Sequence, residues 1–431
     1  MTSDAGVPLL PTRIKKNEGE ASISGAVFNV STTIVGAGIM SVPATLKVLG
    51  VIPAFFLIIV VAVLADISVN FLLRFTYSGD STAETATYGG VMRESFGWVG
   101  SFLVQISVII TNLGGLIVFL IIIGDVLSGS DSGESLHLGV LQEWFGSHWW
   151  NAQPCALLFV VVFVLLPLVL FRRVESLRFS SAVSVFLAVV FVCISFVMAI
   201  SALFHGKTEK PRLFPDLDGQ SSFFNLFTAV PVIVTAFTFH FNVHPISSEL
   251  DKPSKMKVAT RISLVLCAVI YFSVGFFGYL LFGDSIASDI LVNFDSSSTS
   301  PLLNDVVRLS YALHLVLVYP LLNFSLRGNI DELLFFKKGV LASGNNFTFI
   351  SLTSTLLALS YLAAIAIPDI WLFFQYVGST TVISIAFIFP AAITLRDVRG
   401  ISSTRDKVIA VSMVILAVVT STISITANIY S

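Results

Sequence analysis

Charged residues are scarce in this chain. Asp, Glu, Lys and Arg make up only 12% of its 431 residues, whereas 55% are hydrophobic and the mean hydropathy is +0.91. A soluble protein of this length carries about a quarter of its residues as charged side chains. So little charge excludes a surface that faces water throughout. We therefore expect most of the apolar excess to face lipid.

Several kinds of functional signal are also missing. The three cysteines, Cys155, Cys193 and Cys267, fall in or beside apolar segments and form neither a metal-ligand spacing nor a disulfide framework. The chain has no nucleophile elbow and no phosphate-binding loop. Its net charge of −2 argues against a polyanionic partner. We therefore expect no enzyme activity, no metal, no cofactor and no nucleic-acid partner.

The first 20 residues lack the short apolar core and the small-residue cleavage site of a signal peptide. They are polar, and Arg13, Lys15 and Lys16 are among them. We expect residues 1–20 to form a disordered cytosolic tail ahead of a transmembrane domain over 21–428. The first apolar helix then serves as the insertion signal.

Long apolar runs are abundant. A bilayer core of about 30 Å needs roughly 20 apolar residues per helix, and polar stretches divide the chain into eleven such segments. The predicted spans are 22–49, 52–77, 98–127, 151–171, 179–204, 222–248, 257–282, 304–325, 347–367, 369–395 and 406–428. Only Pro368 and Asp369 separate the ninth span from the tenth, so one long helix there, and ten spans in all, is the alternative.

The distribution of basic residues favours eleven spans. With a cytosolic N-terminus, this topology places nineteen of the 24 Lys and Arg residues on the cytosolic side. The five on the far side are Lys47, Lys207, Lys210, Arg212 and Arg308. Cytosolic loops carry the excess of Lys and Arg in membrane proteins. Ten spans would move the last four basic residues to the far side, so we predict a C-terminus in the lumen or outside.

The first span contains an unusual break. Polar residues cluster between Asn29 and Thr33, and Gly36-Ala37-Gly38 follows. Each Gly weakens a helix by about 1 kcal/mol relative to Ala, and an unwound turn survives in a membrane only where it lines a polar cavity. The freed N–H groups suit a carboxylate. We predict a substrate site at Thr33, Gly36, Ala37 and Gly38; close helix packing through small residues is the alternative.

A second interruption lies five spans later. After Pro231, the polar residues Thr235, His240, Asn242 and His244 interrupt the sixth apolar run. An inverted repeat of five helices places the first and sixth helices in equivalent positions. We predict repeats over about 22–204 and 222–395, with an extra helix over 406–428. Substrate-binding candidates here are Thr235, Phe239 and His240; a helix that merely ends at the cytosolic interface is the alternative.

Three groups of residues carry a family resemblance. They are Ser24-Gly25-Ala26-Val27-Phe28-Asn29 running into Gly36-Ala37-Gly38-Ile39, then His240 to Ile246 with Glu249-Leu250, and Arg308-Leu309 with Pro320 and Arg327. They resemble the amino acid/auxin permease family, and within it the vacuolar amino-acid transporters, which are related to the sodium-coupled neutral amino acid transporters. The likeness covers about residues 20 to 425.

This resemblance implies a LeuT-type fold: an all-α integral membrane protein of eleven transmembrane helices, with a 5+5 inverted repeat and broken helices 1 and 6. It implies a cytosolic N-terminus and amino acids as substrates. For the plant and fungal members it also implies a vacuolar or other endomembrane location, which we expect here in preference to the plasma membrane.

One departure from the family pattern concerns the coupling ion. The sodium-coupled relatives hold the ion with an Asn of helix 1 and a Thr of helix 8. The corresponding positions here are Thr32 and the valines Val316 and Val318. A valine side chain offers no oxygen ligand, so the departure argues against Na⁺. Proton coupling, or export driven by the substrate gradient, is favoured.

Ionisable and polar residues within spans are the candidates for coupling. Besides Thr32, they are Asp66, which shares a helix face with Asn70 and Arg74, and His314 in the middle of the eighth span. A histidine titrates near neutral pH and suits proton loading. The structural alternatives are an Asp66–Arg74 ion pair and a neutral His314 hydrogen-bonded between helices.

The sequence therefore predicts a secondary active transporter of amino acids. A membrane sensor or receptor that binds an amino acid with little transport is the alternative, and a channel is a further one. Broken helices in repeat-related positions favour alternating access over a channel. The small, polar and aromatic residues around the predicted site fit neutral amino acids better than acidic ones, although both remain open, as does the direction of transport.

Overall fold

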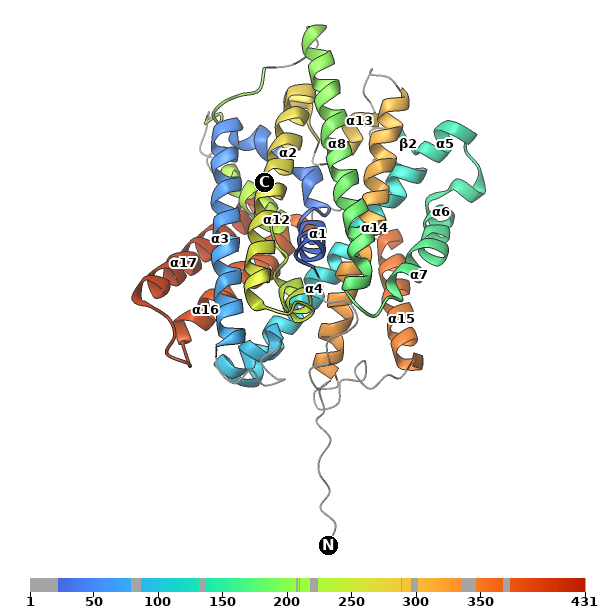
Figure 1. The fold of residues 1–431 in the computed structure, drawn as a ribbon. Helices are drawn as coiled ribbons and strands as arrows, with labels where there is room; N and C mark the ends of the chain where they lie inside the picture. The colour runs from blue at the N-terminus through green and yellow to red at the C-terminus, as the bar shows by residue number, and fades with distance from the viewer. Residues whose placement is uncertain are drawn as a thin grey trace.

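The structure is a computed structural model, and it shows a bundle of helices (Figure 1). It describes residues 22–78, 87–131, 136–206, 208, 210–217, 224–287, 289–295, 301–334, 346–366 and 373–430. The predicted tail over 1–20 and the predicted boundary at Pro368 and Asp369 lie outside these residues. Because apolar runs in lipid must satisfy their backbone hydrogen bonds internally, they form helices.

The elements of the first half are α1 (Ile23–Ile34), α2 (Gly38–Leu49), α3 (Val51–Tyr77), α4 (Tyr88–Ser128), β1 (Gly129–Asp131), β2 (Leu136–Leu138), α5 (Val140–Phe145), η2 (Trp149–Asn151), α6 (Gln153–Val160), η3 (Val161–Leu165), α7 (Leu166–Val169), η4 (Glu175–Leu177) and α8 (Arg178–Phe204). Those of the second half are η5 (Leu226–Thr228), α10 (Ala229–Ala236), α11 (His240–Ser248), α12 (Pro253–Phe282), η6 (Gly283–Ser285), α13 (Ile290–Asp295), α14 (Pro301–Leu334), α15 (Asn346–Ala366), η7 (Phe373–Val382), η8 (Ser384–Ile388), α16 (Phe389–Arg396) and α17 (Thr404–Tyr430).

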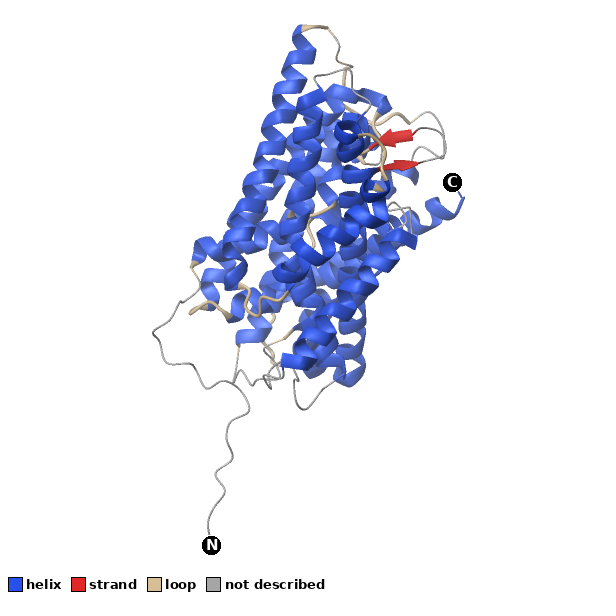
Figure 2. Cartoon of the chain, turned by 90° about the vertical axis from the view of Figure 1, so that its right-hand side faces the viewer, coloured by secondary structure: helices blue, strands red, loops and turns tan. Residues whose placement is uncertain are grey.

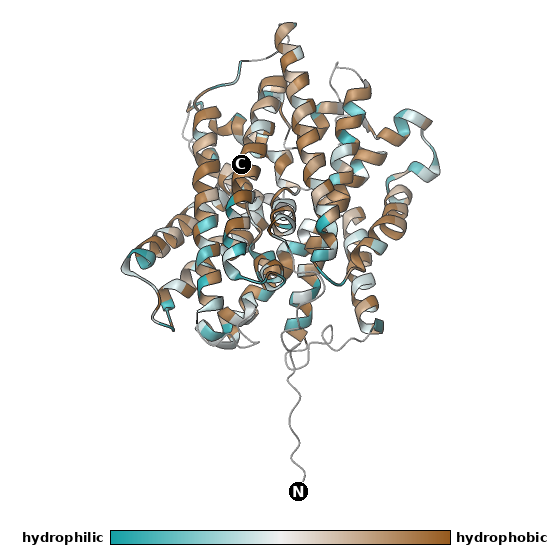
Figure 3. Cartoon of the chain, viewed as in Figure 1, coloured by the Kyte–Doolittle hydropathy of each residue, from teal (hydrophilic) through white to brown (hydrophobic). Residues whose placement is uncertain are grey.

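Helices long and apolar enough to cross a membrane account for most of the bundle. Within the described residues there are nine of them, or ten if the bent pair α1–α2 is one span. A shorter apolar helix, Gln153–Val169, lies at the predicted span 151–171. The chain is thus a multi-pass, all-helical integral membrane protein, as predicted. Apolar side chains predominate along the helices in Figure 3.

Burial differs strongly among these helices. In α14, 78% of the residues in its apolar window are buried within the protein, whereas in α17 only 22% are. α14 packs against α4 and α8, and α1 lies against α8 and α12 (Figure 1). The centre of the bundle is therefore built from α1, α4, α8, α12 and α14, and α17 lies at its edge.

Two helices near this centre are interrupted. α1 ends at Ile34, α2 begins at Gly38, and their axes differ by 57°. In the sixth predicted span, α10 ends at Ala236 and α11 begins at His240. The two breaks touch: a Cβ atom added at Gly38 would lie 2.9 Å from the Cα and Cβ atoms of Ala236. Only glycine allows this close approach.

Some features differ from the sequence prediction. A short antiparallel hairpin pairs β1 with β2, with Ser130 opposite His137 (Figure 2). The third predicted span, 98–127, is part of the longer α4, which bends at Gly97, where φ is 67°. Such short strands and a helix continued across a bend leave little hydropathy signal, because neither changes the apolar run that identifies the span.

Candidate functional site

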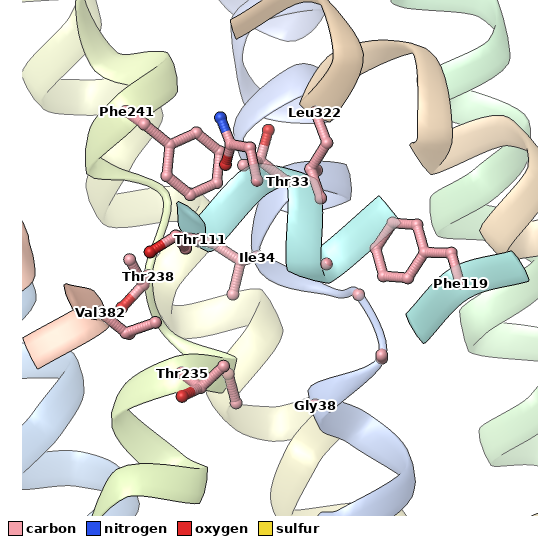
Figure 4. A pocket seen from close by; sticks show the side chains of 15 residues that line it. Thr33, Ile34, Gly38, Thr111, Phe119, Thr235, Thr238, Phe241, Leu322 and Val382 are labelled. Atoms are coloured by element: carbon pink, nitrogen blue, oxygen red, sulfur yellow. The ribbon is translucent and has the colours of Figure 1, made fainter. Parts of the chain in front are cut away.

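A cavity opens where the two helix breaks meet, and α4 forms its opposite wall (Figure 4). Fifteen residues line it: Thr33, Ile34, Gly36, Ala37, Gly38, Thr111, Asn112, Gly115, Phe119, Thr235, Ala236, Thr238, Phe241, Leu322 and Val382. About 480 Å³ of empty space lies between these atoms, including the space on the side that is open to solvent. None of the fifteen lining side chains carries a charge.

Side chains from neighbouring helices hold the α1–α2 break in place. The carbonyl oxygen of Ile34 accepts a hydrogen bond of 2.5 Å from the Tyr271 hydroxyl, and that of Gly36 accepts one of 2.9 Å from the Tyr311 hydroxyl. The break removes the i+4 partners of these carbonyls and leaves Ile34 with the Gly36 N–H at 2.9 Å and Gly36 with the Ile39 N–H at 3.4 Å. The tyrosines of α12 and α14 therefore replace the hydrogen bonds that the break removes.

Tyr271 also connects the two breaks. Its hydroxyl lies 2.5 Å from the Ile34 oxygen and 2.8 Å from the Ala236 oxygen, at the end of α10. The ring packs edge-on against Phe237, with the centroids 5.1 Å apart. One buried side chain thus fixes the relative position of both interrupted helices.

The start of α2 presents free backbone donors to the cavity. Among the hydrogen bonds of the described residues, none involves the N–H group of Ala37 or Gly38. No side chain caps this helix, which runs for 12 residues, and no acidic residue lies in its first turn. Free N–H groups and the helix dipole make such a terminus a site for a carboxylate.

Polar side chains on the other walls differ in their hydrogen bonding. Thr33 donates to the Asn29 oxygen at 2.8 Å, and Thr238 donates to the Val234 oxygen at 2.6 Å. Thr235 Oγ1, in contrast, has no hydrogen-bond partner among the described residues. This oxygen lies on the η7 side, 2.8 Å from the position of a Cβ atom added at Gly378. A free hydroxyl oxygen of this kind can accept a hydrogen bond from an ammonium group.

The structure brings five of the seven predicted substrate-binding residues to this cavity: Thr33, Gly36, Ala37, Gly38 and Thr235. The other two do not line it. Phe239 is fully buried beside His240, and His240 Nε2 lies 2.6 Å from Ser68 Oγ of α3. His240 therefore joins α11 to α3.

Sequence reasoning missed the contribution of α4 to the cavity. Four residues at helical spacing form this wall: Thr111, Asn112, Gly115 and Phe119. The only local signal is the pair Thr111-Asn112 within an otherwise apolar run. A polar pair in a membrane helix indicates a buried face, but the sequence does not show which helix that face meets.

The predicted coupling residues have separate surroundings. Thr32 donates to the Ser181 oxygen of α8 at 2.9 Å. Asp66 forms an ion pair with Arg261 of α12, at 3.3 Å. The alternative pairing with Arg74 is wrong, because Arg74 pairs with Asp406 of α17 at 3.0 Å. Residues eight apart on a helix lie two turns away from each other, so a partner on a facing helix is closer.

His314 bridges the α1–α2 break and α8. Its Nε2 lies 2.7 Å from the Val35 oxygen, and its Nδ1 lies 2.8 Å from both the backbone oxygen and Oγ of Ser184. A neutral imidazole carries one N–H and can donate to only one carbonyl, whereas the imidazolium can donate to both. Protonation therefore decides whether one or two carbonyls are bound.

Other titratable groups lie around the same break. They are Tyr271 and Cys267 of α12, and Tyr311, which stacks on His314 with 5.5 Å between ring centroids. Asp289, in the loop before α13, interacts electrostatically with Tyr311. Burial raises the pKa of the Asp289 carboxyl to about 6, and the bond it accepts from the Leu291 N–H opposes that rise. Asp289 is therefore partly protonated between pH 5 and 7.

A cavity between two interrupted helices, at the centre of a bundle of membrane spans, is the arrangement of a helical membrane transporter. The family described as transmembrane amino acid transporter protein matches residues 19–430. The chain belongs to that family, in agreement with the amino acid/auxin permease resemblance, and its relatives are transporters rather than enzymes.

The relatives match along nearly the whole chain. The sequence is 60% identical to the amino acid transporter AVT6C of Arabidopsis thaliana, covering 100% of this chain and 99% of that relative. It is 58% identical to AVT6D of the same plant, covering 98% and 97%. A solved manganese transporter from Eremococcus coleocola has a TM-score of 0.59 at 15% identity, covering 97% of this chain and 89% of that one. At so low an identity the likeness shows the fold alone.

Proposed function

We propose that this chain is a secondary active transporter that moves amino acids through the cavity by alternating access. One observation carries the proposal: an uncapped helix start with free N–H groups at Ala37 and Gly38 faces a cavity without charged side chains. The substrate carboxylate binds these N–H groups, and its ammonium group binds Thr235 Oγ1. The family membership and the names of the relatives support amino acids as the cargo.

The architecture that goes with this function has eleven spans. Residues 22–204 and 222–395 form two inverted repeats of five spans, and 406–428 is the extra helix. The breaks in α1–α2 and α10–α11 support this arrangement, because an inverted repeat of five helices has its first and sixth spans in equivalent positions. The distribution of basic residues supports an N-terminus in the cytosol and a C-terminus on the far side. The family resemblance supports a vacuole or another endomembrane compartment as the location.

Coupling in this proposal uses protons, or the substrate gradient alone, and not sodium. At the positions where sodium-coupled relatives hold the ion, Val316 and Val318 supply no oxygen ligand. His314 instead lies between the carbonyls of Val35 and Ser184. In the charged form it binds both carbonyls. In the neutral form Ser184 Oγ donates to its Nδ1, and only the Val35 carbonyl keeps its bond.

The test is transport by purified protein in proteoliposomes, using a panel of labelled amino acids and imposed pH or Na⁺ gradients. We expect uptake of neutral amino acids, with a response to pH and none to Na⁺. Counterflow of labelled amino acid separates a transporter from a sensor, since a sensor binds without exchange. Binding without counterflow would overturn the proposal, and a response to Na⁺ alone would overturn its coupling.

A further inference from the structure

Asn112 is the most unusual polar residue of the cavity. Its side chain is completely buried, and neither Oδ1 nor Nδ2 has a hydrogen-bond partner among the described residues. A buried carboxamide without partners is destabilising, because its donor and its acceptor have both lost their hydrogen bonds to water. Because Asn112 lines the cavity, a bound molecule can supply the missing donor and acceptor.

The other hydroxyl groups on this side of the cavity are already paired. Thr111 Oγ1 lies 2.8 Å from Thr381 Oγ1, and Thr33 Oγ1 accepts a bond of 3.1 Å from Asn242 Nδ2. Asn112 is therefore the side chain on the α4 wall with unused donor and acceptor groups. A carboxamide both donates and accepts, so it complements another carboxamide or a hydroxyl.

The position of Asn112 separates it from the substrate's backbone groups. Phe119 of α4 lies next to the α1–α2 break, since a Cβ atom added at Gly36 would be 3.2 Å from its Cζ atom. Asn112 lies seven residues before Phe119, which is about 10 Å along the helix. With the carboxylate at Ala37 and Gly38, only the end of the substrate's side chain reaches that far.

From these contacts we infer that Asn112 selects amino acids with a long, uncharged polar side chain that ends in an amide, by hydrogen bonding to the end of that side chain. The inference rests on the proposed function. The absence of charge among the lining side chains supports it, because a charged substrate side chain would be buried without a counter-ion. A site built around a hydrogen bond also rejects an apolar analogue that leaves its polar group unpaired.

The experiment compares substrates of nearly equal shape in proteoliposomes. Glutamine against methionine tests the amide, and serine against alanine is the control pair, because a serine hydroxyl is too short to reach Asn112. In the wild type, kcat/KM favours glutamine over methionine. Asn112→Leu replaces the amide with an apolar group of similar size, and we expect the glutamine-to-methionine ratio to fall by about tenfold or more, with methionine transport retained.

Asn323→Leu is the matched control. Asn323 is also buried, with both side-chain polar atoms unpaired among the described residues, but it does not line the cavity. This variant should leave both substrate ratios unchanged. If Asn112→Leu does not reach the membrane folded, Asn112→Ala removes the amide without adding bulk and should lower the same ratio.

The outcomes separate the inference from the function on which it rests. Transport of alanine and methionine with unchanged ratios in both Asn112 variants would overturn the role of Asn112 and leave the transporter intact. Equal shifts in Asn112→Leu and Asn323→Leu would also overturn it, as a general packing effect. A wild type that transports no amino acid would overturn the proposed function together with the inference.

Discussion

The two helix breaks that meet at the cavity are held in different ways. At the first, three consecutive carbonyl oxygens, those of Ile34, Val35 and Gly36, accept hydrogen bonds from side chains of α12 and α14. Among the described carbonyls at the second break, only that of Ala236 accepts a bond from another helix, donated by Tyr271. Three side-chain contacts to carbonyls therefore fix the first break. The second break has one such contact, and its α11 side is held separately by the contact of His240 Nε2 with Ser68 Oγ of α3.

This difference assigns separate roles to the two breaks. The α1–α2 break holds the proposed carboxylate site at the start of α2, because three of its carbonyls accept bonds from α12 and α14. The α10–α11 break depends on Tyr271 and on the close contact with Gly38. A substitution at the first break should therefore disturb the geometry of both breaks. Substitutions away from the breaks should change transport little.

The largest effect is expected where the breaks touch. Gly38→Ala places a methyl group 2.9 Å from the Cα and Cβ atoms of Ala236, so α2 and α10 must separate. A displacement of about 1 Å at such a site lowers activity by about 100-fold, and we expect a loss of this order in the uptake rate. Initial rates of alanine uptake, normalised to the protein recovered in the liposomes, measure the loss.

Gly328→Ala is the control for that substitution, because a Cβ atom at Gly328 meets nothing within 4 Å. It should transport at the wild-type rate. If Gly38→Ala also did so, the close contact would not position the two breaks.

A smaller loss is expected on removing the bond that joins the breaks. Tyr271→Phe leaves two buried carbonyls, those of Ile34 and Ala236, without their side-chain donor. We expect transport to fall by about tenfold and the thermal midpoint to fall as well, since each lost buried hydrogen bond costs about 1 kcal/mol.

Tyr319→Phe separates these two consequences. The Tyr319 hydroxyl lies 2.9 Å from Ser360 Oγ, and this contact joins α14 to α15 away from the cavity. The variant should lower the thermal midpoint with little change in transport per folded molecule. Equal transport losses in both tyrosine variants would show that Tyr271 acts only through stability.

A third prediction concerns pH and the first break alone. Below the pH at which His314 loses its proton, both of its ring nitrogens donate to carbonyls, and above it one of these bonds is lost. His314→Gln cannot make this change, so the pH dependence of transport should flatten. Labelled uptake at a series of pH values, with the exposed His205→Gln as control, measures it. An unchanged profile would remove His314 from the mechanism.

The sequence predicts those parts of the site whose signals lie close together in the chain. The α1–α2 break was predictable because Gly36 and Gly38 follow a polar cluster within one apolar run, and all of that information is local. The role of Asn112 was not predictable, because it depends on how α4 faces two breaks that are far away in the chain. The Asp66–Arg261 pair joins residues 195 positions apart and gives no local signal either.

The smallest effect is expected at that ion pair, which lies outside both breaks. The side chain of Arg261 is 67% exposed and that of Asp66 is 22% exposed, and exposed pairs of this kind contribute about 0–1 kcal/mol. Asp66→Asn should therefore change the uptake rate by less than about twofold and leave the pH profile in place. Loss of the pH dependence in this variant, with His314 intact, would move the coupling site from the first break to the contact between α3 and α12.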